Sequence, residues 1–220
     1  MTGLTDAIQR VADLGGPVVL LLIAVSIVTL AVVLYKLWQF SRAGVGRHTA
    51  LAEAVSAWDR GDRSAARAAL GRSKSYLAPV IDMALGAGSS AATRLEAEAE
   101  TRFARLERGL RFLDSVAQLA PLLGLFGTVL GMIEAFQALQ EAGSQVDPSI
   151  LAGGIWVALL TTAVGLVVAM PTALALSWFE ARMDSERVTA SRAIHTILAP
   201  QGRGGLTNAA AEPGRAPAHA

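Results

Sequence analysis

The chain contains no cysteine among its 220 residues, which excludes disulfide bonds and thiolate metal sites. Charged residues are also scarce, at 17% of the chain, and aromatic residues make up only 5%. Hydrophobic residues account for 53%, and the mean hydropathy of +0.45 is too high for an ordinary soluble domain. The composition therefore indicates a membrane protein.

Three stretches lack charged residues altogether: 22 residues from 14 to 35, 19 from 115 to 133, and 32 from 148 to 179. A transmembrane helix needs roughly 20 apolar residues, so each stretch can cross a bilayer once. We do not expect the first stretch to be a cleaved signal peptide, because it is too long and Asp6 and Asp13 precede it. The sequence predicts an all-α membrane protein with three transmembrane helices and long cytoplasmic helical extensions.

Positive charge is scarce in two of the segments that flank these stretches. Thirteen of the 19 Lys and Arg residues lie between Lys36 and Arg111, and five follow the third stretch. The first 13 residues hold only Arg10, and segment 135–148 holds none. Because positively charged loops stay in the cytoplasm, we predict a periplasmic N-terminus and a cytoplasmic C-terminus.

The charge pattern and the hydropathy together divide the chain into eight segments. The predicted order is a periplasmic N-terminus 1–13, transmembrane helix 14–40, cytoplasmic helical region 41–111, transmembrane helix 112–139, periplasmic loop 140–148, transmembrane helix 149–180, cytoplasmic helix 181–200 and disordered tail 201–220.

The cytoplasmic region is expected to be helical throughout. Segment 49–70 predicts a helical hairpin that is broken at Gly61, with Asp62 as the N-cap of the second helix. An apolar stripe then indicates one long helix that continues into the second transmembrane helix without a break. The stripe consists of Leu95, Ala99, Phe103, Leu106, Leu110 and Leu113.

Small residues recur at helical spacing in the second and third apolar stretches. Helices in lipid associate through close packing, which small residues permit. We therefore expect these strips to pack tightly, within one subunit and between copies, although strips that only pack are common in membrane proteins. The strips are Gly124, Gly127 and Gly131 in the second stretch and Gly154, Ala158 and Gly165 in the third.

Thr128, Thr161 and Thr162 lie near the middle of the same two stretches. One interpretation is that each hydroxyl bonds back to a carbonyl of its own helix. The other is that the three hydroxyls form a polar lining. The chain has no carboxylate at this depth, so a proton path here would need an acid from another polypeptide.

No catalytic, metal, cofactor or nucleic-acid motif is present in the sequence. The three histidines, His48, His195 and His219, are scattered, and no nucleophile–base spacing accompanies them. We expect His48 and His195 to be surface groups at helix ends. The sequence predicts a protein that is not an enzyme, needs no cofactor and binds no nucleic acid.

Two segments of the sequence resemble a known family. "LAPLLGLFGTVLGMIEAF" (119–136) and "GGIWVALLTTAVGLVVAMP" (153–171) closely resemble the two pore helices of ExbB, TolQ and MotA-type proton channel subunits. Members of the MotA type usually have four transmembrane helices, so the three predicted here favour the ExbB/TolQ branch.

The resemblance implies a homopentamer in the bacterial inner membrane whose second and third helices line a central pore. It implies a single-span ExbD- or TolR-like partner in that pore, which carries an essential aspartate. The expected function is to couple the proton motive force to TonB-dependent transport through a TonB-like protein. A TolQ-like motor that drives a TolA-like protein, or a non-conducting membrane scaffold, is the alternative.

The resemblance also assigns roles to single residues. Thr128 and Thr162 stand where the family has its pore threonines, and Thr161 lies beside them. Val157 stands where ExbB and TolQ usually carry a glutamate. Glu134 lies six residues outward of Thr128, nearly level with Val157, which lies five residues outward of Thr162. We hypothesise that Glu134 replaces this glutamate at the outer end of the proton path; the alternative is a boundary charge that reaches water. The lack of further polar ligands beside Thr128 favours H⁺ over Na⁺.

Overall fold

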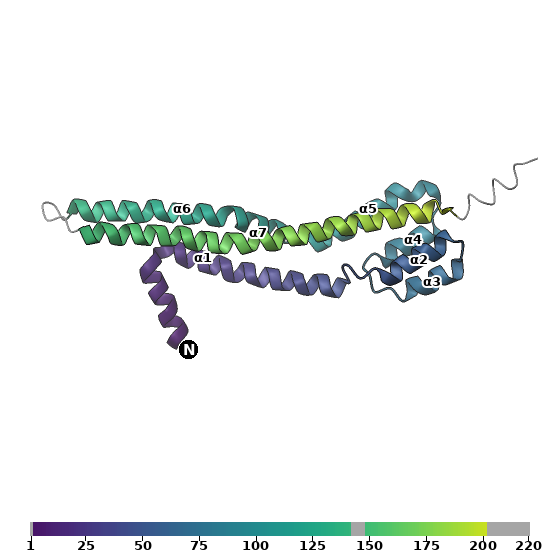
Figure 1. Cartoon of the computed structure of the whole chain (residues 1–220), viewed down its shortest axis with the longest axis horizontal. Helices are drawn as coiled ribbons and strands as arrows, with labels where there is room; N and C mark the ends of the chain where they lie inside the picture. Colours follow the sequence, from purple (N-terminus) through teal and green to yellow (C-terminus); the bar gives the residue numbers. More distant parts are fainter. Residues whose placement is uncertain (1, 142–147, 202–220) are drawn as a thin grey trace, which may run out of the picture. The chain divides into compact units, whose positions relative to one another are not determined.

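The computed structural model describes residues 2–141 and 148–201, with side chains described from Gly16 onward except at 148 and 150. Every regular element in these residues is helical (Figure 1). The elements are α1 (Thr2–Ala43), α2 (Thr49–Asp59), α3 (Arg63–Gly71), α4 (Ala78–Gly86), the 3₁₀ turn η1 (Ser89–Ala91), α5 (Ala92–Glu107), α6 (Leu110–Glu141) and α7 (Pro148–Leu198). The described part of the chain confirms the all-helical prediction.

Three helices are long and apolar enough to cross a membrane, over Gly16–Ala43, Leu110–Glu141 and Leu151–Leu198. The three predicted transmembrane stretches fall within α1, α6 and α7. In α7 the charge-free stretch ends at Phe179, and charged residues follow from Glu180 onward without a break in the helix. The predicted helix 181–200 is therefore the second part of α7. Most of the predicted loop 140–148 and of the predicted tail 201–220 lies outside the described residues.

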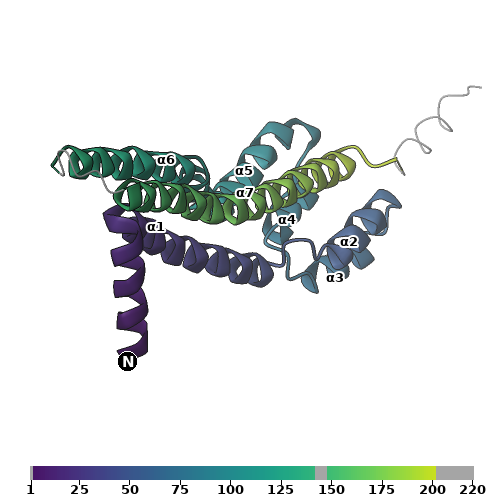
Figure 2. The same cartoon turned by 60° about the vertical axis from the view of Figure 1, so that its left-hand side comes forward.

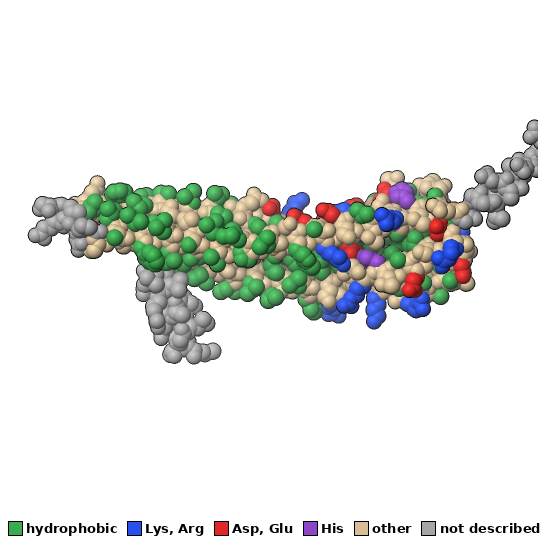
Figure 3. All heavy atoms as spheres, viewed as in Figure 1, with side chains coloured by type: hydrophobic (Ala, Val, Ile, Leu, Met, Phe, Trp, Pro, Cys, Tyr) green, Lys and Arg blue, Asp and Glu red, His purple; other side chains and the backbone are tan. Residues whose placement is uncertain are grey.

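The chain forms two compact units, which we describe separately. The membrane unit comprises the described residues of 1–36 and 109–180, and the polar unit those of 37–108 and 181–220. Hydrophobic side chains predominate on the visible face of the membrane unit, whereas most Lys, Arg, Asp and Glu side chains in view lie on the polar unit (Figure 3).

In the membrane unit, α6 and α7 lie side by side along the apolar part of both helices (Figures 1 and 2). Helix α1 is kinked at Gly16, whose φ of 65° is not helical, and Pro17 follows. After the kink, α1 packs on the other two helices through one apolar cluster. The cluster consists of Val18 and Leu22 of α1, Val116 and Ala120 of α6, and Val168 and Ala169 of α7.

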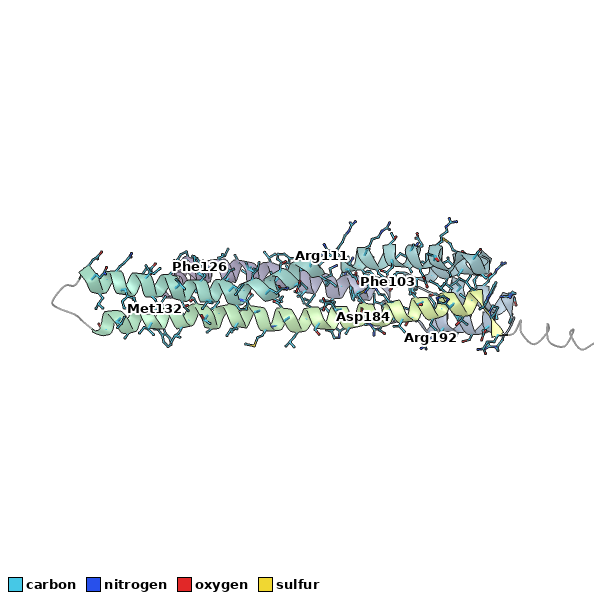
Figure 4. All side chains as sticks on the ribbon, turned by 90° about the horizontal axis from the view of Figure 1, so that it is seen from above. Phe103, Arg111, Phe126, Met132, Asp184 and Arg192 are labelled. Carbon is cyan, nitrogen blue, oxygen red and sulfur yellow. The ribbon has the colours of Figure 1, made fainter. Side chains whose placement is uncertain are left out.

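In the polar unit, α2 and α3 form the predicted hairpin. The Asp62 carboxylate accepts a hydrogen bond of 2.9 Å from the Ala65 N–H, which confirms Asp62 as the N-cap of α3. Helix α5 contacts the polar part of α7 around Phe103, which is labelled in Figure 4. Arg187 of α7 lies 5.5 Å from the Phe103 ring and forms ion pairs with Glu100 at 3.2 Å and Glu107 at 2.7 Å.

The predicted long helix from residue 95 into the second transmembrane stretch is wrong at one point. All six residues of its apolar stripe are buried, but the helix is interrupted between α5 and α6 at Arg108 and Gly109. Gly109 adopts a φ of +89°, a left-handed conformation that glycine adopts without steric cost. The stripe remains apolar across the break, which is why periodicity alone indicated a single helix.

Candidate functional site

The candidate site lies where α6 and α7 approach most closely. A Cβ atom added at Gly165 would lie 2.6 Å from the carbonyl oxygen of Ala120 and 3.1 Å from the Gly124 Cα. A Cβ atom added at Gly124 would lie 2.9 Å from the carbonyl oxygen of Thr161. These separations are shorter than van der Waals contact, so the two backbones approach to a distance that only glycine permits.

The same helix pair has a constant antiparallel register. Gly124 faces Gly165, and seven residues further along α6 Gly131 faces Ala158, seven residues back along α7. Four more residues bring Ala135 against Gly154. This register places Thr128 level with Thr161.

Two of the three threonines converge on one carbonyl group. Thr161 is 2% exposed, and its hydroxyl lies 2.7 Å from the Ala158 carbonyl of its own helix and 3.2 Å from the Gly124 carbonyl of α6. The Thr162 hydroxyl lies 3.3 Å from the same Gly124 carbonyl. Thr161 also fills the space beside Gly127, where an added Cβ would lie 2.7 Å from the Thr161 Oγ1. Polar bonds as well as small residues therefore join α6 to α7.

Thr128 is arranged differently from the other two threonines. Its hydroxyl donates to the carbonyl of Leu125, one turn back in its own helix, at 2.6 Å. The side chain is half-buried. Because a hydroxyl carries one proton and two acceptor lone pairs, Thr128 keeps its capacity to accept a hydrogen bond from a further group.

Glu134 and Val157 lie at different positions relative to the helix contact. Glu134 is exposed, next to Ala135, which packs against Gly154. Val157 is half-buried, next to Ala158. The register places Val157 level with Met132, so Glu134 lies two residues, about 3 Å, further along the helix axis.

The outer faces of the two helices remain apolar and exposed. Phe126 of α6, which Figure 4 labels, is 53% exposed. The other large exposed side chains between residues 119 and 174 are Leu119, Leu122, Leu125, Val129, Ile133, Phe136, Ile155, Trp156, Leu159, Leu166, Val167, Met170 and Leu174. Such a surface needs lipid or another protein to cover it.

The expectation that His48 is a surface group is wrong. Its side chain is 15% exposed, and its Nε2 lies 2.8 Å from the carboxylate of Glu186, a residue that the sequence did not single out. His195 is exposed, as expected, and pairs with Glu96 at 3.0 Å. His219 lies outside the described residues. Within residues 2–141 and 148–201, no group of three or more His, Asp or Glu residues is arranged to hold a metal ion.

Comparison with known proteins gives a match that includes both helices of the site. The model of the MotA/TolQ/ExbB proton channel family matches residues 65–191, which is more than half of the chain. This range contains all of α6 and most of α7.

Individual relatives align over shorter segments. The biopolymer transport protein exbB1 of Vibrio cholerae is 48% identical over 63 residues, which cover 29% of this chain and 28% of the relative. ExbB of Salmonella typhimurium is 33% identical over 104 residues, 47% of this chain and 42% of the relative. The Tol-Pal system protein TolQ of Haemophilus influenzae is 41% identical over 80 residues, 36% of this chain and 35% of the relative.

The aligned segments thus span less than half the length of each of these relatives. The family match nevertheless includes both helices that carry the small-residue strips and the three threonines, and the chain has three helices suited to cross a membrane. The chain is therefore a multi-pass membrane protein that belongs to the MotA/TolQ/ExbB proton channel family, in its ExbB/TolQ branch.

Proposed function

We propose that this chain is the channel subunit of an inner-membrane motor that couples the proton motive force to work in the cell envelope. The observation that carries the proposal is that Thr128 on α6 and Thr161 and Thr162 on α7 lie at the same position along the helix axes. Three hydroxyls lie there, and the charge-free stretches of the described helices α1, α6 and α7 contain no Asp, Glu, Lys, Arg or His. Because proton transfer within the bilayer requires a titratable group, a partner must supply the acid.

The proposed partner is an ExbD- or TolR-like protein with one transmembrane helix and an aspartate in it. Thr128 can accept a hydrogen bond from a protonated carboxyl group while it donates to the Leu125 carbonyl. The 3.3 Å bond from Thr162 to Gly124 is long, so it can be exchanged for a bond to the same carboxyl group or to water. Thr161 is buried between the helices, and we assign it the role of positioning Thr162.

The proposed assembly is a homopentamer around a central pore, in which the exposed apolar faces of α6 and α7 meet other copies, the partner helix or lipid. The proposed topology places the N-terminus in the periplasm and the polar unit in the cytoplasm. The Lys and Arg content of segment 37–108 supports this topology.

Glu134 is the proposed carboxylate at the outer end of the path. The exposure of its side chain supports this role. The resemblance described above supports it as well, because it implies a glutamate in ExbB and TolQ at the position of Val157. The partner helix or a neighbouring copy can therefore reach Glu134 without displacing α7.

The proposed client is a TonB-like protein that energises transport across the outer membrane. A TolQ-like role with a TolA-like client uses the same site, and the similarity to the Tol-Pal system protein TolQ favours it as the second candidate. A non-conducting scaffold is a third candidate, which the apolar Val157 and the own-helix bond of Thr128 favour.

The test is to express the chain alone and with a single-span partner that carries a transmembrane aspartate, and to reconstitute each in liposomes with a pH-sensitive dye inside. We expect proton flux only from the complex, and none when the partner's aspartate is replaced by asparagine. A stable complex that conducts no protons, with or without that aspartate, would support the scaffold instead.

A further inference from the structure

The polar unit contains a buried carboxylate that the proposed proton path does not use. Glu186 lies on α7 beyond the charge-free stretch, and it is 1% exposed. Its Oε1 accepts hydrogen bonds of 2.8 Å from the Gly46 N–H and from the His48 Nε2. Its Oε2 accepts a bond of 2.8 Å from the Tyr76 hydroxyl. Residues up to 140 positions apart in the sequence thus meet at one carboxylate.

The loop between α1 and α2 is closely fitted around this carboxylate. Gly46 adopts a φ of +80°, and a Cβ atom added there would overlap the guanidinium group of Arg182. The other ring nitrogen of His48, Nδ1, lies 3.4 Å from the Ser75 hydroxyl, which also accepts a bond from the Leu77 N–H at 3.2 Å. The cluster therefore fastens two loops, 44–48 and 73–77, to α7.

The carboxylate is held in its charged form although it is buried. Burial raises the pKa of Glu186, but hydrogen bonds from His48 and Tyr76, the charge of His48 and the Gly46 N–H together hold this pKa below its usual value. Burial and the neighbouring carboxylate raise the pKa of Tyr76, so its phenol keeps its proton and remains a donor. The cluster thus places a buried negative charge against a half-buried imidazole.

An imidazole is the side chain that ordinarily changes its charge between about pH 5 and 8. When it takes up a proton beside a buried carboxylate, it adds a positive charge that offsets the negative one. We propose that His48 and Glu186 form a proton-linked latch, which holds loop 44–48 on α7 more firmly in acidic than in alkaline solution. In the topology proposed above, the latch faces the cytoplasm and connects internal pH to the segment that follows the first transmembrane helix.

Other charged groups of the polar unit surround the latch. Arg182 lies against Gly46, and Arg182 and Arg187 both act on the Tyr76 hydroxyl. Arg192 of α7 and Asp59 of α2 line the same groove as His48. Of these side-chain types, imidazole is the one that ordinarily changes its charge between about pH 5 and 8, so the test replaces His48.

The chain contains its own matched control for this proposal. His195 and Glu96 form a second histidine–glutamate pair, at 3.0 Å, but the two side chains are 60% and 44% exposed. Exposed pairs contribute little to stability because solvent screens them. Replacing His195 therefore removes the same kind of pair from an exposed contact between α5 and α7, which does not involve loop 44–48.

The test is hydrogen–deuterium exchange of the full chain in detergent, followed by mass spectrometry of a peptide that covers residues 44–48. The Gly46 amide is bonded to Glu186, so its protection from exchange measures how often the latch opens. Each rate is divided by the intrinsic exchange rate at the same pH. The wild type is expected to lose protection as the pH rises from 6.0 to 8.5, by up to about tenfold per pH unit, which is the slope for one linked proton.

His48→Gln keeps a hydrogen-bond donor but cannot gain a charge, so protection in this variant is expected to be independent of pH. His195→Gln is expected to keep the wild-type slope. The proposal is overturned if the wild type shows no slope, if His48→Gln keeps it, or if His195→Gln loses it. The measurement needs neither partner nor ion flux, so its outcome is independent of the proposed channel function.

Discussion

The hydroxyl of Thr161 lies 3.2 Å from the carbonyl oxygen of Gly124, a polar contact between two helices that otherwise meet through small residues. Both residues belong to the closest part of the α6–α7 contact, and Thr162 reaches the same carbonyl. Because this contact sets the register of the two helices, it determines that Thr128, Thr161 and Thr162 lie at the same position along the helix axes.

The close contact predicts that the glycines of the two strips differ in their tolerance of alanine. Gly165→Ala is expected to destabilise the protein by about 1–3 kcal/mol, because the new methyl group meets the backbone of α6, which cannot move aside. Gly131→Ala is expected to be tolerated, since its methyl group would lie 3.4 Å from the Ala158 side chain, an ordinary contact. The measurement is the unfolding temperature of the purified protein in detergent.

Gly153→Ala is the control for this series. Gly153 lies on the same helix, and a Cβ atom added there has no neighbour within 4 Å. An unfolding temperature for Gly165→Ala equal to that of Gly153→Ala would contradict the close approach of the helices.

The break between α5 and α6 predicts a second effect of backbone conformation. Gly109→Ala is expected to cost about 1–2 kcal/mol, because a residue with a side chain is strained at a φ of +89°. Its methyl group would also lie 3.4 Å from the Lys36 Cε. Gly71→Ala, in a helix with open space around the added methyl, is the comparison and should be neutral or stabilising. Equal unfolding temperatures for the two variants would argue for an unbroken helix.

The Glu186 cluster predicts how stability depends on pH in acid. Because the pKa of Glu186 is lower in the folded protein than in an unfolded chain, its stabilising contribution is complete above the usual value of 4.5. The contribution is lost as the pH falls from there through the lower, folded value. Tyr76→Phe removes one donor and so brings the folded pKa of Glu186 closer to 4.5. The loss of stability in acid should therefore be smaller than in the wild type and should end at a higher pH. The measurement is the unfolding temperature of the wild type and of Tyr76→Phe between pH 3 and 6. If the unfolding temperatures of both proteins fell by the same amount over this pH range, the prediction would be contradicted.

The proposed role of Glu134 predicts that loss of its charge lowers proton flux, whereas loss of another charge on the same helix does not. Glu134→Gln keeps the volume and removes the charge, so we expect proton flux through the complex to fall while assembly persists. Glu141→Gln, at the end of α6, is the matched control and should conduct normally. Restoration of flux by Val157→Glu in the Glu134→Gln variant would establish that the carboxylate has moved between helices. Unchanged flux in Glu134→Gln would make Glu134 an ordinary boundary residue.

The sequence predicted the features of this protein that depend on neighbours along the chain. The length of the stretches without charged residues identified the three apolar helices. The Gly61–Asp62 pair identified the helical hairpin and the N-cap of its second helix. Gly109 also carried a local signal, since a glycine after a basic residue commonly ends a helix. The continuous apolar stripe obscured that signal, because burial on one face can persist through a break.

Contacts between distant segments could not be predicted in the same way. The spacing of small residues identified the face of α6 that packs closely against another helix. The register with α7, however, depends on how the two backbones fit together. His48 and Glu186 are 138 residues apart, and neither has a local pattern that names its partner. An isolated histidine in a polar segment is expected to be a surface group. Only the folded structure shows that His48 lies against the buried carboxylate of Glu186.

The most direct test of the account is proton flux through the reconstituted complex of Thr128→Val and Thr162→Val variants with the single-span partner. Valine keeps the volume of threonine and removes only the hydroxyl, so the amount of intact complex should match the wild type. We predict that flux is abolished in both variants, and that Thr172→Val, which removes a hydroxyl bonded only to the Val168 carbonyl in the described structure, leaves flux unchanged. Wild-type flux through the Thr128→Val and Thr162→Val complexes would show that these hydroxyls serve helix packing and not a proton path.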